Sequence, residues 1–184
     1  STFAATDIYG GASISNGQNV GATDGKYSFF PGWLNGGAGS SVLTSLLSTG
    51  SLPYHALTHS YILADAATVF NSTYAKGFLG AVYLNGKVIY LPGYYNSVGG
   101  AYTAMYDTSS TFTTTSSWTG VDISTLLGYA HGGASSIDGY TGAAYDGRYL
   151  YYAPSGRTSF FDQAFGVIAR YDTQGAIGSA SSWT

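Results

Sequence analysis

Short apolar segments alternate with glycine-containing turns along this chain, and the same pattern occurs three times. Each segment places apolar and aromatic residues on both sides of an Asp-Gly or Asn-Gly dipeptide and ends in proline: Val20–Pro31, Ala81–Pro92 and Gly142–Pro154. These dipeptides supply the two positive φ angles that a two-residue type I′ turn requires. The pattern predicts three β-hairpins, each with a basic residue directly after the turn.

The turns are regularly spaced, since Asp24-Gly25, Asn85-Gly86 and Asp146-Gly147 follow one another at intervals of 61 residues. A third strand ending in aspartate is predicted in each copy, at Ser60–Asp65, Ala101–Asp107 and Gly166–Asp172. A fourth segment carries Ser-Ser-Trp at Ser116–Trp118 and Ser181–Trp183, with Asn71–Tyr74 as a weak match. Each copy therefore holds about four short strands.

A fixed period of this length indicates a repeat architecture within a single domain over residues 1–184. The copies run from about 9 to 74, 75 to 128 and 129 to 184. Ser1–Ile8 would continue from Thr184 as Gly120–Ile123 continues from Thr119. The sequence therefore predicts that residues 1–8 complete the third copy, so that the first and last strands pair.

The repeated motif resembles a bacterial β-propeller repeat of the form Gly-Ala-x-Tyr-Asp-Gly-Arg-Tyr-x-Tyr-x-Pro, followed by Arg-Tyr-Asp-Thr and Ser-Ser-Trp. The third copy matches it best, in Gly142–Pro154, Val167–Thr173 and Ser181–Trp183. The first copy departs most, because it lacks the Tyr-Asp-Thr and Trp elements and carries an insertion between Gly32 and Thr58. The resemblance covers nearly the whole chain. It implies four-stranded blades and brings no catalytic residues.

Propellers close with about four to eight blades, so three blades are too few for a ring. The prediction is therefore an all-β protein of β-propeller type, completed by oligomerisation. The missing blades could be supplied in three ways. Two copies could form a homodimer with six blades, many copies could form a fibre or shell, or this chain could be a fragment of a longer one. The alternative fold is a β-trefoil or β-prism, in which three repeats of four strands close by themselves.

The amino-acid composition limits the classes of partner that this chain can bind. Charged residues make up 8% of the chain, the net charge is −3, and there is no cysteine. Such a chain offers no basic surface for nucleic acid, no disulfide and no thiolate metal site. Its apolar stretches are too short to cross a bilayer, so no membrane insertion is predicted. A Ser- and Thr-rich surface with few charges is typical of an extracellular, cell-surface or virion-surface protein.

Loops after the second strands carry the candidate ligand-binding residues Trp33, Tyr94, Tyr95 and Arg157. Exposed aromatic and guanidinium groups stack on sugar rings or anchor protein partners, whereas the structural alternative is that they pack between blades. Asn71 begins an Asn-Ser-Thr sequence, which is an acceptor for N-glycosylation in a secreted protein.

Structural roles are expected for the other repeated polar and aromatic residues. The aspartates at the strand ends can accept hydrogen bonds from the following turns. Basic residues beside the hairpins, at Lys26, Lys87 and Arg148, are expected to be solvated. Trp118 and Trp183 recur at one position, which favours a place in the core.

Evidence for catalysis is slight. His55 and His59 stand four residues apart, and with His131 they form a weak alternative metal site. No nucleophile motif and no glutamate accompany them, so neither an enzyme nor a cofactor is predicted. The expected function is a non-enzymatic structural or assembly protein whose partners are copies of itself. A glycan-binding propeller is the first alternative, and a histidine-metal enzyme is the least favoured.

Overall fold

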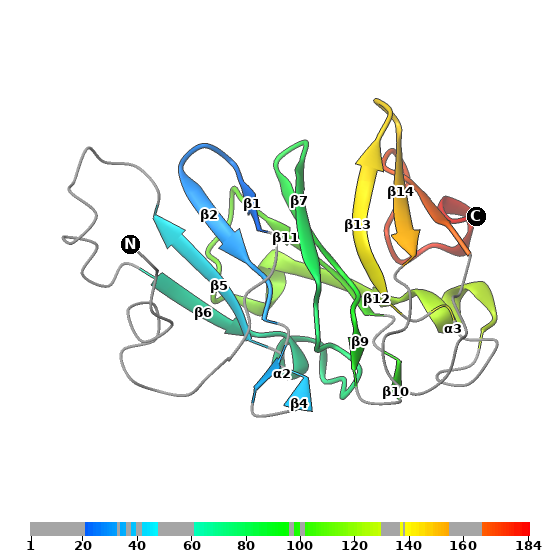
Figure 1. Cartoon of the computed structure of the whole chain (residues 1–184). Coiled ribbons are helices and arrows are strands. Elements are labelled where there is room, and N and C mark those ends of the chain that lie inside the picture. The colour runs from blue at the N-terminus through cyan, green and yellow to red at the C-terminus, as the bar shows by residue number, and fades with distance from the viewer. Residues whose placement is uncertain are drawn as a thin grey trace, which may run out of the picture.

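The computed structural model describes residues 21–32, 34–35, 38–39, 42–47, 61–95, 98–99, 102–129, 137, 139–154 and 167–184. These residues form three antiparallel sheets of four, four and three strands, together with two small two-stranded hairpins (Figure 1). The predicted all-β class is therefore confirmed.

The first two sheets have the same arrangement, in which strands that follow one another in the sheet also follow one another in the chain. The first sheet contains, in order, β1 (Ala22–Thr23), β2 (Tyr27–Phe30), β5 (Val42–Leu47) and β6 (Tyr61–Asp65). The second contains, in order, β7 (Gly80–Leu84), β8 (Lys87–Leu91), β11 (Tyr102–Asp107) and β12 (Trp118–Asp122). Both are antiparallel meanders of four strands.

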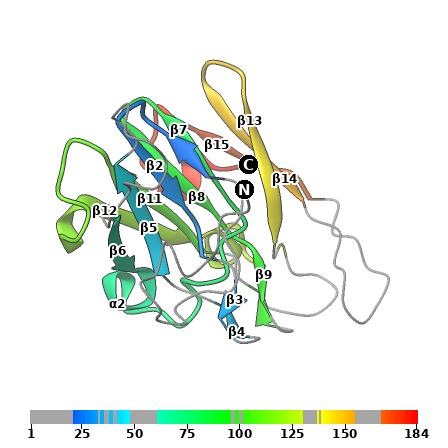
Figure 2. The same ribbon diagram turned by 60° about the vertical axis from the view of Figure 1, so that its left-hand side comes forward.

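The third sheet has three strands, β13 (Tyr140–Tyr145), β14 (Tyr149–Pro154) and β15 (Ala169–Asp172). Trp183 adds an isolated antiparallel bridge to Tyr171, beyond β15. The second sheet stands between the other two, because β7 contacts β1 on one side and β13 on the other (Figures 1 and 2). The sheets therefore follow one another in space in the order in which they occur along the chain.

Small hairpins lie between the second and third strands of the first two sheets. They are β3 (Leu34–Asn35) with β4 (Ala38–Gly39), and β9 (Tyr94–Tyr95) with β10 (Val98–Gly99). Both lie at one end of the molecule, opposite the turns that join the first and second strands of each sheet (Figures 1 and 2). Loops of the same kind thus gather at the same end.

Short helices follow the fourth strands. Helix α2 (Ala66–Phe70) is N-capped by Asp65, and helix α3 (Ile123–Leu127) is N-capped by Asp122, each through a carboxylate that accepts a backbone N–H. Short 3-10 turns, η2 (Thr115–Ser117) and η3 (Ala180–Ser182), precede Trp118 and Trp183. None of the described helices is long and apolar enough to span a membrane.

Two details of the predicted strand assignment were wrong. Ser60–Asp65 was predicted to be a third strand, but β6 is the fourth strand of its sheet, and β5 within the long insertion is the third. Asn71 was matched to the Ser-Ser-Trp segment, but it ends α2 in the left-handed conformation, with φ 48°. The error arose because aspartate ends fourth strands as well as third strands, so the final residue alone did not distinguish them.

The hairpin turns follow the prediction only at Asn85-Gly86, where φ is 50° and 75° and Leu84 pairs with Lys87. Asp24 and Asp146 do not adopt positive φ. Their carboxylates instead accept the backbone N–H groups two and three residues ahead, at 2.6–2.9 Å. A charged acceptor stabilises this wider turn, which neutral Asn85 does not form.

Among the described residues the core consists of two clusters, one between each pair of neighbouring sheets. The first is dominated by aromatic rings around Trp118, and the second contains Trp183 with more aliphatic side chains. The two tryptophans are 7% and 5% exposed, and each indole N–H donates to a backbone carbonyl six residues earlier at 2.7 Å. The predicted core role of both tryptophans is therefore confirmed.

Candidate functional site

The predicted ligand-binding residues are placed only in part. Tyr94 and Tyr95 form strand β9, where they pair with Gly99 and Val98. Trp33 and Arg157 lie outside the described residues, as do the three histidines His55, His59 and His131. The predicted completion of the third copy by residues 1–8 also lies outside them.

Asn71, the candidate glycosylation residue, is exposed at the end of α2. Its backbone N–H bonds to the helix carbonyls of Ala67 and Thr68. The proposed modification stays a prediction that the geometry permits, because the residue stands at the protein surface.

The third sheet has an outer face, turned away from the second sheet, that the sequence did not single out. We define this outer face by the residues Tyr149, Tyr151, Ile168 and Arg170. Successive side chains of a strand point to opposite faces. Leu150, Tyr152, Ala169 and Tyr171 are buried toward the second sheet, so the residues between them point outward. Ile168 is 59% exposed, and Val167 beside it is 37% exposed.

Cations and rings organise this outer face. The guanidinium of Arg170 lies 4.6 Å from the centre of the Tyr149 ring, and that of Arg148 lies 4.9 Å from it. The Tyr151 hydroxyl donates to the Asp146 carboxylate at 2.9 Å. One tyrosine ring flanked by two guanidinium groups, with a second tyrosine beside it, forms an amphipathic surface suited to contact with another protein surface.

The corresponding faces of the first two sheets are buried. On the second sheet, Ile89 and Leu91 point toward the third sheet and are 2% and 1% exposed. On the first sheet, Phe29 and Leu43 belong to the cluster shared with the second sheet and are 1% and 0% exposed. The outer face of the third sheet is therefore partly exposed, from half-buried Tyr149, Tyr151 and Arg170 to exposed Ile168, where the same side of the other two sheets is covered.

Two of the three basic residues after the turns form cross-strand ion pairs, while their side chains stay in contact with solvent, 37% exposed for Lys87 and 53% for Arg148. Lys87 pairs with Asp107 across β8 and β11, and Arg148 pairs with Asp172 across β14 and β15, the latter at 2.7 Å. Both aspartates also accept the backbone N–H two residues ahead, as predicted for strand ends. Each carboxylate thus links the turn of one hairpin to the end of the next strand.

The pKa of Asp107 is lowered to about 2, first by the hydrogen bond from Lys87 and then by those from Ser109. A lowered carboxyl pKa stabilises the fold above the unfolded pKa of about 3.9, and this contribution is lost as the pH falls toward 2. We expect Lys87→Ala to raise the pKa of Asp107, measured by carbon NMR of the carboxyl groups.

Asp146 is the internal control for this titration. Its pKa is lowered mainly by backbone N–H groups of Tyr149 and Arg148, which Lys87→Ala leaves in place. If the pKa of Asp107 did not change in Lys87→Ala, or if the pKa values of Asp107 and Asp146 rose equally, the ion pair with Lys87 would not be the cause of the low pKa of Asp107.

Within the part of the chain that the structure describes, no cluster of three or more His, Asp, Glu or Cys side chains could hold a metal ion. The described candidate site is instead the outer face of the third sheet, built from two tyrosines, an isoleucine and an arginine. No protein-family model matches this chain, and neither does any curated protein with which it was compared.

Proposed function

We propose that this chain is a non-enzymatic extracellular or surface protein that assembles with copies of itself, and that its three sheets are blades of a β-propeller. Support comes from the serial order of the sheets, in which the first strands β1, β7 and β13 lie next to one another. In a propeller, the blades are sheets of four antiparallel strands around a central channel. Extracellular placement rests on the low charge and the Ser- and Thr-rich composition alone.

The single observation that carries the proposal is the exposed outer face of the third sheet. The same side of the first and second sheets is buried by the next sheet along the chain. Three blades need a fourth surface on this side, and we propose that the first sheet of a second copy supplies it. Two copies give six blades, which lies within the range of closed propellers.

Assembly is tested by light scattering coupled to size exclusion, with Ile168→Asp as the disrupting variant. We expect the unmodified protein to be a dimer and the variant a monomer. A buried, unpaired charge costs several kcal/mol, which corresponds to a rise in Kd of about 100-fold or more.

Tyr129→Asp is the matched control, because Tyr129 is 38% exposed and follows α3 rather than lying on the outer face. It should leave the dimer intact. A monomer at every concentration would overturn the proposal, and so would a dimer that Ile168→Asp does not weaken. The first of these outcomes would favour a self-closing fold such as a trefoil or prism, or a longer chain that covers the face itself.

Glycan binding is the second candidate, favoured by the position of the hairpins β3–β4 and β9–β10 at one end of the molecule (Figure 1). In the second hairpin this brings Tyr94 and Tyr95 to that end. A glycan array tests it, with Tyr95→Ala as the variant. Binding that this variant abolishes would support the candidate, and an array without binding would remove it.

A further inference from the structure

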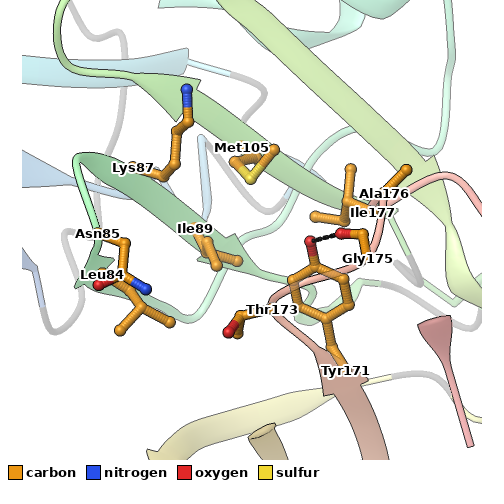
Figure 3. A pocket seen from close by; sticks show the side chains of 10 residues that line it. All are labelled: Leu84, Asn85, Lys87, Ile89, Met105, Tyr171, Thr173, Gly175, Ala176 and Ile177. Carbon is orange, nitrogen blue, oxygen red and sulfur yellow. Dashed lines mark hydrogen bonds between the residues drawn. The ribbon is translucent and has the colours of Figure 1, made fainter. Parts of the chain in front are cut away.

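A pocket of about 260 Å³ opens between the second and third sheets (Figure 3). Its apolar walls include Ile89 from β8, Met105 from β11, Tyr171 from β15 and Ile177 from the segment after β15. Asn85 and Lys87, beside the β7–β8 turn, complete the lining, and the Lys87 ammonium is paired with Asp107. The pocket therefore combines apolar walls with polar groups that come from one side.

In the corresponding region between the first and second sheets, equivalent side chains make the same hydrogen bonds to backbone carbonyls. There the Tyr106 hydroxyl donates to the carbonyl of Ser110, as the Tyr171 hydroxyl donates to that of Gly175. The indole of Trp118 bonds to the Phe112 carbonyl, as that of Trp183 bonds to the carbonyl of Ile177. Phe112 and Ile177 therefore hold the same place in two similarly built loops.

Aromatic rings fill the region between the first two sheets. The ring of Phe112 lies 4.8 Å from Tyr106 and 6.1 Å from Phe29, measured between ring centres. Between the second and third sheets, Ile177 holds the place of Phe112, and Ile89 of β8 faces the third sheet as Phe29 of β2 faces the second. Two aliphatic side chains thus replace two rings, and the pocket lies beside them.

From this difference we infer that the pocket binds a small ligand with one aromatic ring and an anionic group. The apolar walls suit a ring of the kind that fills the first interface, and Met105 offers a thioether for sulfur–aromatic contact. The ammonium of Lys87 has three N–H donors, of which the bond to Asp107 uses one. The remaining donors and the Asn85 amide can bind a carboxylate.

Met105 gives a direct test, because it is the single methionine of the chain and lines the pocket. Protein labelled with carbon-13 at the methionine methyl group should show one signal. We expect benzoate to shift that signal saturably through the ring current of the bound ring. Cyclohexanecarboxylate, which has the same charge without an aromatic ring, should produce no such shift.

Three variants make the result specific. Ile177→Phe should fill the pocket and abolish the shift. Ala176→Phe, at the exposed edge of the pocket, should also abolish the shift. This variant replaces Ile177→Phe in the test if Ile177→Phe does not fold. Lys87→Ala should weaken benzoate at least tenfold while leaving the weaker binding of neutral benzyl alcohol unchanged.

The inference is overturned if benzoate does not shift the Met105 signal, or if the shift persists in both filled variants. If Lys87→Ala weakened the binding of benzoate and of benzyl alcohol equally, the inference that the ligand carries an anionic group would be overturned. All the pocket residues come from one copy of the chain, so the site does not depend on assembly, and a monomeric protein would leave the test intact.

Discussion

Replacing Trp118 with alanine is expected to lower the free energy of unfolding by about 3–5 kcal/mol, as for other buried tryptophans. The indole is 7% exposed and stacks 5.8 Å from the Tyr90 ring. It also lies 4.9 Å from the ring of Phe112 and bonds to the carbonyl of that residue. The substitution therefore removes ring contacts and leaves a buried carbonyl without its donor. Urea unfolding followed by circular dichroism measures the loss.

Trp118→Phe separates the two effects. It keeps most of the ring volume and removes the N–H group, so the expected loss is about 1–3 kcal/mol, the cost of an unsatisfied buried acceptor. Tyr83→Ala is the surface control, because Tyr83 is 39% exposed, and it should change stability by less than about 1 kcal/mol. A loss at Trp118→Ala no larger than that at Tyr83→Ala would contradict the assignment of Trp118 to the core.

Gly93→Ala is expected to destabilise the protein by about 3 kcal/mol or more, because no space exists for a methyl group. A Cβ atom at Gly93 would lie 1.9 Å from the carbonyl oxygen of Gly77 and 2.6 Å from Cγ of Leu79. The backbone would have to move at a point where the Pro92 carbonyl accepts the N–H of Tyr140, at 2.7 Å. The change would thus disturb the contact between the second and third sheets.

Gly142→Ala is the matched control, since a Cβ atom there meets nothing within 4 Å and the residue lies in strand β13. Thermal unfolding of the two variants should differ widely, with Gly142→Ala close to the unmodified protein. Equal melting temperatures would show that the Gly77–Gly93 approach can relax at little cost.

Local signals made much of the fold predictable. The Asn85-Gly86 turn, the strands on either side of it and the buried tryptophans all depend on residues close together in sequence. Such features follow from backbone preference and side-chain size, which a single sequence reveals. The same reasoning was wrong at Asp24 and Asp146, because a carboxylate that captures two backbone N–H groups changes the turn.

Long-range features could not be predicted in the same way. Strand β5 lies in the insertion of the first copy, so the repeat pattern gave no signal for it. The pair Lys87–Asp107 depends on the register between β8 and β11, which the hairpin β9–β10 separates along the chain. The outer face of the third sheet became apparent only when its exposure was compared with that of the other two sheets.

The serial order of the sheets also bears on how this protein folds and how it could have grown. Each sheet joins strands that are neighbours along the chain, so its pairing needs few long loop closures, which favours rapid formation. Where structural units contact only the units next to them, stability is approximately a sum over units and their interfaces. Duplication of one segment would then lengthen the chain by a sheet without rearranging those already present.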